Sequence, residues 1–126
     1  MGAECRRRVL LAASNLIVGI SVADELELAG HEVVGPFRSC GAALKALAQS
    51  PPDIAVLDAV LNDAPSDFVT GELARAGVPV VILTAWSRQS HISVEYESTT
   101  WLPLPCPAGA VVEVVEALLP GASPGL

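Results

Sequence analysis

Two short apolar segments constrain the fold of this chain most strongly. Residues 54–58 read Ile-Ala-Val-Leu-Asp, residues 80–84 read Val-Val-Ile-Leu-Thr, and proline precedes both segments closely. Four consecutive apolar residues, rich in β-branched types, are typical of strands buried on both faces of a parallel sheet. The last residues, Asp58 and Thr84, would then lie at the carboxyl edge of the sheet, where open α/β sheets bind ligands. Asp58 is thus a candidate phosphoryl or metal site, although a lone aspartate more often caps a helix or bonds loop amides.

Size and composition indicate one cytoplasmic domain. The chain has 126 residues, a net charge of -7, and three cysteines without paired spacing. This length suffices for one buried core, and the cysteine pattern fits a reducing compartment rather than a disulfide framework. The acidic charge argues against nucleic-acid binding, which requires clustered Lys and Arg. No apolar stretch approaches the roughly 20 residues of a membrane span, and the N-terminus lacks a signal-peptide pattern. We therefore expect a cytoplasmic location and no membrane contact.

Strand and helix patterns alternate along the sequence. Strands are predicted over residues 9–13, 31–35, 54–58 and 80–84, with a short one around Trp101 and Leu102. Helices are predicted from a cap at Ser14 or Asn15 to about Ala29, over residues 40–49, from a cap at Ser66 to Gly77, and over residues 108–119. Residues 85–100 lack a helical stripe, so we expect a reduced fourth helix. The pattern predicts an α/β domain over residues 8–119, a doubly wound five-stranded parallel sheet, with flexible termini at 1–7 and 120–126.

Apolar residues in the first two helices recur at helical spacing, so each helix is expected to bury one face. The predicted inward residues of the first helix are Leu16, Ile20, Ala23 and Leu26. Those of the second helix are Ala43, Leu44, Leu47 and Ala48. Gly30 is expected to end the first helix in the left-handed conformation.

Three segments together resemble a known signalling module. They are residues 26–35 (Leu-Glu-Leu-Ala-Gly-His-Glu-Val-Val-Gly), 52–58 (Pro-Asp-Ile-Ala-Val-Leu-Asp) and 79–85 (Pro-Val-Val-Ile-Leu-Thr-Ala). With these segments the chain resembles a response-regulator receiver domain, the phospho-acceptor module of two-component signalling, over nearly all of residues 8–119. The resemblance implies a flavodoxin-like fold with strand order 2-1-3-4-5.

The resemblance also implies roles for individual residues. Asp58 falls at the phospho-acceptor position, where a carboxylate attacks a phosphoryl group. Thr84 matches the switch hydroxyl, and Trp101 matches the aromatic residue that packs inward when that hydroxyl moves. The backbone carbonyl of Val60 matches a magnesium ligand. The implied partners are a histidine kinase or phosphotransfer protein and a downstream protein, and the module is not itself expected to be an enzyme.

The sequence departs from the receiver pattern at the metal site and at the lysine. The acidic pair falls on Ala13 and Ser14, and the lysine position falls on Leu104. Asp58 and Val60 alone would bind Mg²⁺ weakly, because this cation usually takes one or two carboxylates among its oxygen ligands. Arg88 could supply the missing charge, although an exposed loop arginine is the simpler interpretation.

Three functions remain open from the sequence. The first is a phosphorylatable receiver in phosphorelay signal transduction that signals through a downstream protein. The second is a phosphorylation-independent pseudo-receiver that acts as a protein-interaction module, which Ala13, Ser14 and Leu104 favour. The third is a domain that binds flavin or another small ligand, but residues 14–17 (Ser-Asn-Leu-Ile) are poor in the Ser, Thr and Gly that such a loop needs. The sequence does not identify the kinase, the output partner or the oligomeric state.

Overall fold

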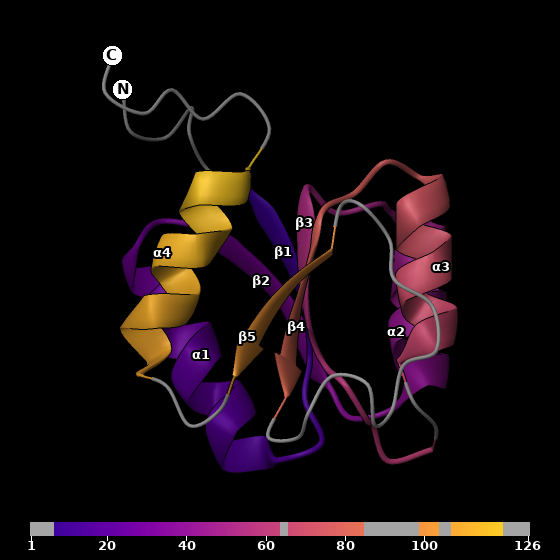
Figure 1. Cartoon of the computed structure of the whole chain (residues 1–126), viewed down its shortest axis with the longest axis horizontal. Coiled ribbons are helices and arrows are strands. Elements are labelled where there is room, and N and C mark those ends of the chain that lie inside the picture. Colours follow the sequence, from indigo (N-terminus) through magenta and orange to yellow (C-terminus); the bar gives the residue numbers. More distant parts are fainter. Residues whose placement is uncertain (1–6, 64–65, 85–98, 104–106, 120–126) are drawn as a thin grey trace.

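The computed structural model describes residues 7–63, 66–84, 99–103 and 107–119. In this part of the chain five parallel strands form one sheet in the order β2-β1-β3-β4-β5, with helices on both faces (Figure 1). The strands are β1 (Arg8–Ala12), β2 (Glu32–Phe37), β3 (Ile54–Asp58), β4 (Val80–Thr84) and β5 (Thr99–Pro103). The helices are α1 (Leu16–Leu28), α2 (Cys40–Gln49), α3 (Asp67–Arg75) and α4 (Ala108–Leu118). The predicted doubly wound fold is confirmed. The segment in which a reduced fourth helix was expected, residues 85–98, lies outside the described residues.

Each strand contributes alternate side chains to two separate core clusters. Leu10 of β1 and Leu57 of β3 belong to the cluster under α2 and α3, whereas Leu11 and Val56 belong to the cluster under α1 and α4. Figure 1 shows these two helix pairs on opposite sides of the sheet. This alternation follows from the two-residue period of a strand, and it leaves the strand ends as the edge where polar side chains can gather.

The second strand runs further than the sequence indicated. We predicted a strand over residues 31–35, but β2 continues to Phe37, and its pairing with β1 shifts register between Leu10 and Ala12. Gly35 permits this shift because its φ is +119° and a Cβ there would lie 2.3 Å from the carbonyl oxygen of Leu11. The main-chain N–H of Ala13 then donates to the carbonyl of Phe37 at 2.8 Å, which fixes the chain just beyond β1.

The buried face of α1 also differs from the prediction. Leu16 and Ile20 were expected inside, but each is 48% exposed. The buried residues of the helix are Gly19, Val22 and Leu26. A Cβ on Gly19 would lie 3.1 Å from the Cβ of Pro36, so this glycine lets the helix approach β2 along a different side. In α2, Ala43 and Leu47 are buried as predicted, while Leu44 is half-buried and Ala48 is exposed.

The helix ends test three predictions made from the sequence. Asn15 caps α1, because its side chain accepts hydrogen bonds from the N–H groups of Ile17 and Val18. Gly30 follows α1 with φ +96°, as predicted. Ser66 occupies the N-cap position of α3 as predicted, but its side chain makes no capping hydrogen bond: the Ser66 hydroxyl donates to the carbonyl of Ala59 instead. None of the described helices is long and apolar enough to cross a membrane.

Candidate functional site

Asp58 lies at the carboxyl edge of the sheet, between two neighbouring strands. It is the last residue of β3, it pairs with Leu83 of β4, and it is only 9% exposed. On the other side, Leu57 pairs with Ala12, the last residue of β1. The residues that follow β1, Ala13 and Ser14, therefore lie at the same sheet edge as Asp58.

Ser14 binds the Asp58 carboxylate through two groups. Its main-chain N–H donates to Oδ2 of Asp58 at 2.8 Å, and its hydroxyl donates to the same oxygen at 3.0 Å. Sequence reasoning had treated Ser14 as a lost acidic position or as a helix cap, and missed this contact. The available signal was the polar residue that follows β1, because the ends of adjacent parallel strands meet at one edge.

The environment of Asp58 opposes its ionisation. Burial raises the pKa of the Asp58 carboxyl above its usual value, because the charged form loses solvation. The N–H and hydroxyl of Ser14 and the main-chain N–H of Asn15 act in the opposite direction and lower the pKa, but burial is the larger effect. Asp58 is thus a desolvated carboxylate held by hydrogen-bond donors.

The described residues around Asp58 do not fit a magnesium site. Ala13 is apolar and 1% exposed, and Ser14 directs two donors at one of the two carboxylate oxygens, Oδ2. No group of three or more His, Cys, Asp or Glu side chains that could hold a metal exists among the described residues. Mg²⁺ requires several oxygen ligands in near-octahedral geometry, and Asp58 with the Val60 carbonyl supplies too few.

The structure describes the other predicted site residues, Thr84, Trp101 and Leu104, only in part. Thr84 ends β4 and pairs with Pro103 of β5, so its backbone lies at the same sheet edge as Asp58, while its side chain lies outside the described part of the structure. Trp101 pairs with Ile82, is half-buried and packs against the core cluster under α2 and α3. Leu104, the position of the missing lysine, lies outside the described residues.

The loop after Asp58 is bonded on both sides. The N–H of Ala59 donates to the carbonyl of Leu83 at 2.9 Å, and the Ala59 carbonyl accepts from the N–H of Ser66 at 2.9 Å. Further along, the N–H of Asn62 donates to the carbonyl of Arg38 at 3.0 Å. The chain segment next to Asp58 is therefore connected to β4, to the start of α3 and to the segment before α2.

Asp63 fastens this loop to the N-terminus of α2. Its Oδ1 accepts the N–H of Cys40 at 2.7 Å, and its Oδ2 accepts the N–H of Gly41 at 3.2 Å. The Cys40 N–H in particular lowers the pKa of the Asp63 carboxyl. A carboxylate is favoured at a helix N-terminus, where the first N–H groups lack helical partners. Nothing local in the sequence distinguishes Asp63 from an ordinary loop aspartate, so this anchor was not predicted.

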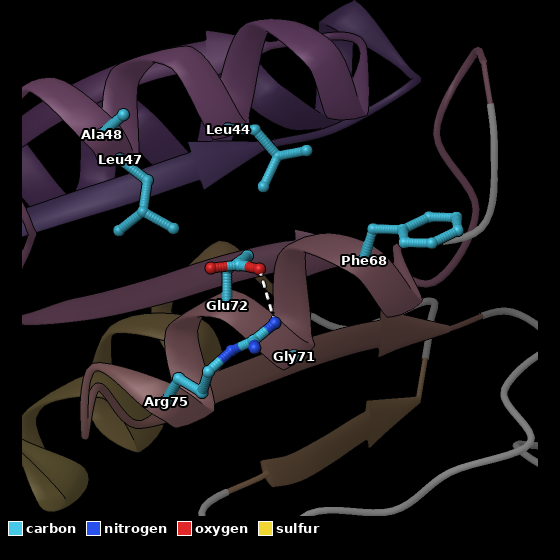
Figure 2. A pocket seen from close by; sticks show the side chains of 7 residues that line it. All are labelled: Leu44, Leu47, Ala48, Phe68, Gly71, Glu72 and Arg75. Carbon is cyan, nitrogen blue, oxygen red and sulfur yellow. Dashed lines mark hydrogen bonds and ion pairs between the residues drawn. The ribbon is translucent and has the colours of Figure 1, made fainter.

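A hollow of about 500 Å³ lies between α2 and α3. Figure 2 shows Leu44 and Leu47 of α2 pointing toward α3, where Glu72 and Arg75 form an ion pair of 2.6 Å, and Ala48 also lines the hollow. The remaining lining residues are Phe68 and Gly71. Phe68 is 70% exposed. None of the predicted site residues lines this hollow, so it is separate from the Asp58 edge.

Comparison with known proteins identifies the fold. No protein-family model and no curated protein matches the chain. The response regulator receiver protein from Sinorhizobium medicae superposes with a TM-score of 0.80 at 20% identity, covering 95% of this chain and 99% of that one. SdrG from Sphingomonas melonis gives a TM-score of 0.75 at 24% identity, covering 90% and 96%. The chain has the receiver-domain fold.

The receiver fold also occurs as part of longer proteins among the similar structures. The response regulator PhyR from Brucella abortus superposes with a TM-score of 0.77 at 21% identity over 90% of this chain. This chain spans 48% of that PhyR chain, about half its length. At these identities the receiver fold is the shared property.

Proposed function

We propose that the chain is a response-regulator receiver in phosphorelay signal transduction, with Asp58 as the phospho-acceptor and a degenerate metal site. The observation that carries the proposal is the position of Asp58, at the carboxyl end of β3 in a receiver fold. In this proposal the chain works in the cytoplasm and acts through protein contacts rather than through enzymatic activity of its own.

The proposed chemistry needs an ionised carboxylate and a phosphodonor. An oxygen of Asp58 attacks phosphorus, the bond between phosphorus and the donor atom breaks, and the leaving group takes its electron pair. The donor is the phosphohistidine of a kinase or phosphotransfer protein, or a small molecule such as acetyl phosphate. Thr84 is proposed to bond a phosphoryl oxygen, with Trp101 responding to its movement. We assign no step to Mg²⁺, because the described residues do not fit it.

Labelling with acetyl phosphate tests the proposal directly. Wild-type protein should gain one phosphoryl group by intact-mass measurement, and Asp58→Ala should gain none. Asp24→Ala, which removes an exposed carboxylate on α1, is the matched control and should be labelled as fully as the wild type. Absence of a label on the wild type with acetyl phosphate and with kinases of the native host, or a label that persists in Asp58→Ala, would contradict the proposal.

A second candidate is a phosphorylation-independent pseudo-receiver that acts as a protein-interaction module. The observation that favours it is the pair of Ser14 donors on Asp58, where a receiver would place acidic metal ligands. A protein captured from the native host should then bind wild type, Asp58→Ala and Thr84→Ala with affinities within about threefold. A tenfold or larger dependence on Asp58 and on a phosphodonor would support the phosphorelay function instead.

A further inference from the structure

The contact between Ser14 and Asp58 has a feature that distinguishes it from an ordinary loop hydrogen bond. Both donors of Ser14 converge on one oxygen, Oδ2, at 2.8 Å and 3.0 Å, and Ser14 is held in place by the adjoining residues. Ala13, its neighbour, bonds to the carbonyl of Phe37, and Asn15 caps α1. The donors are therefore positioned by the backbone at the start of α1 and not by a mobile side chain alone.

A buried carboxylate needs compensation for its lost hydration, and hydrogen bonds to a charged acceptor are the stronger kind. Mg²⁺ could also compensate the carboxylate for its lost hydration, but only if several oxygen ligands coordinated the cation. Here the N–H and O–H hydrogens of Ser14 point at Oδ2. A cation near Oδ2 would be repelled by the positive ends of the N–H and O–H bond dipoles. Ser14 and a cation therefore compete for the position next to this oxygen.

We propose that Ser14 takes the place of a divalent cation at this site, so that the folded state around Asp58 is independent of Mg²⁺. The significance of this replacement for signalling rests on the proposed function of Asp58. The replacement itself concerns folding and is tested without any phosphate.

The first test compares chemical unfolding in millimolar Mg²⁺ with unfolding in EDTA. The unfolding equilibrium constant of the wild type should change by less than about twofold, because a ligand that does not bind the folded state leaves it unaltered. Ser14→Asp places a second carboxylate beside Asp58, and Mg²⁺ should stabilise this variant by about fivefold or more in the same constant. Ser21→Asp adds the same charge at an exposed position of α1 and should not respond. A fivefold stabilisation of the wild type, or no response of Ser14→Asp, would overturn the proposal.

The second test is a double-mutant cycle in EDTA with Ser14→Ala and Asp58→Ala. If the Ser14 hydroxyl stabilises the Asp58 carboxylate, the two substitutions should be coupled. The change in the unfolding equilibrium constant of the double variant should then differ by about threefold or more from the product of the changes in the two single variants. Ser14→Thr keeps the hydroxyl and should retain the coupling to Asp58. Ser39→Ala removes another half-buried serine, the cap of α2, and should combine with Asp58→Ala multiplicatively. Multiplicative behaviour of Ser14→Ala would overturn the proposal.

The two proposals fail in different measurements. If acetyl phosphate and host kinases leave the wild type unlabelled while the cycle shows coupling, the phospho-acceptor function fails and the serine replacement stands. If Asp58 is labelled but Ser14→Ala shows no coupling, the replacement fails and the phospho-acceptor function stands.

Discussion

At the scale of single residues, two aspartates of this chain lie in opposite environments. Burial raises the pKa of Asp58, and the N–H groups of Cys40 and Gly41 lower the pKa of Asp63. Both carboxylates accept main-chain N–H groups, from Ser14 just before α1 and from Cys40 at the start of α2, so the difference comes from desolvation. Asp58 ends a central strand and is buried, whereas Asp63 is exposed to solvent. The stability that Asp58 contributes should therefore decrease as pH rises, whereas the stability that Asp63 contributes should decrease as pH falls.

Asp58→Asn should stabilise the protein at neutral pH. Because the folded pKa of Asp58 is raised, its contribution to stability is fully present below the unfolded value of 3.8 and is lost as pH rises through the folded pKa. Asparagine keeps an acceptor for Ser14 without the charge. In denaturant unfolding we expect the free energy of unfolding to increase by about 1 kcal/mol or less at pH 7, and not to increase below pH 3.8. A loss of stability at pH 7 would contradict this. Asp24→Asn is the exposed control and should change little.

Asp63→Asn should destabilise the protein at neutral pH and have less effect in acid. The lowered pKa means that the stabilisation by Asp63 is present above 3.8 and is lost as pH falls through the folded pKa. The amide has one acceptor oxygen, so it cannot serve both Cys40 and Gly41 as the carboxylate does. The urea midpoint of the variant should lie below that of the wild type at pH 7, and the difference should narrow toward low pH. A difference that is constant with pH would show that the charge plays no part.

At the scale of the elements, a bulge in β2 sets the position of the chain after β1. Gly35 brings the strand close to Leu11, and the register shift lets Phe37 accept the N–H of Ala13. Ser14 is the next residue, so the geometry of β2 determines where the donors to Asp58 lie. The loop from Ala59 to Asp63 provides the corresponding connection on the other side of the site, toward α2 and α3. The first connection joins backbone groups, and the second combines backbone hydrogen bonds with those of the Asp63 carboxylate.

Gly35→Ala should be among the most damaging single substitutions at the sheet edge. Its φ of +119° strains any other residue, and the new Cβ would lie 2.3 Å from the Leu11 carbonyl oxygen. We expect a loss of more than about 2 kcal/mol in the free energy of unfolding. Gly30→Ala is the matched control: its φ is +96°, but among the described residues no atom beyond Gly30 and its two chain neighbours lies within 4 Å of the added methyl group. Gly30→Ala should lose less free energy of unfolding than Gly35→Ala. Equal losses for the two variants would contradict the role of the close approach between Gly35 and the Leu11 carbonyl.

At the scale of the whole molecule, the architecture could be predicted from the sequence. Along the chain, the spacing of the apolar residues and the length of each apolar segment indicate the same type of element, strand or helix. The bounds of β3, β4 and α2 were predicted as observed, since proline and polar residues border apolar runs of the right length. The face of α1 was not predictable, because Leu16 and Ile20 have the same spacing as a buried stripe and only the approach of Gly19 to Pro36 decides between them. The position of Asp58 was also predictable from its strand.

The partners of Asp58 and Asp63 were less accessible to sequence reasoning. The hydrogen bonds of Ser14 and Asp63 join residues that are 44 and 23 positions apart in the chain. Such pairs depend on the register of β1 against β3 and on the path of the loop after Asp58. Neither is recorded in local composition, so tertiary structure was needed to show which donors meet which carboxylate.

The two core clusters predict that substitutions on opposite faces of the sheet act independently. Val69 of α3 belongs to the cluster under α2 and α3, and Val22 of α1 belongs to the cluster under α1 and α4. Both side chains are buried, at 0% and 3% exposure, so truncation to alanine should cost about 2 kcal/mol each from lost burial and an incompletely filled cavity. Because the sheet separates the two sites, the double variant should lose the sum within about 0.5 kcal/mol, measured by denaturant unfolding of the four proteins. A departure above about 1 kcal/mol would mean that strain passes through the sheet, and the two faces would then have to be treated as one core.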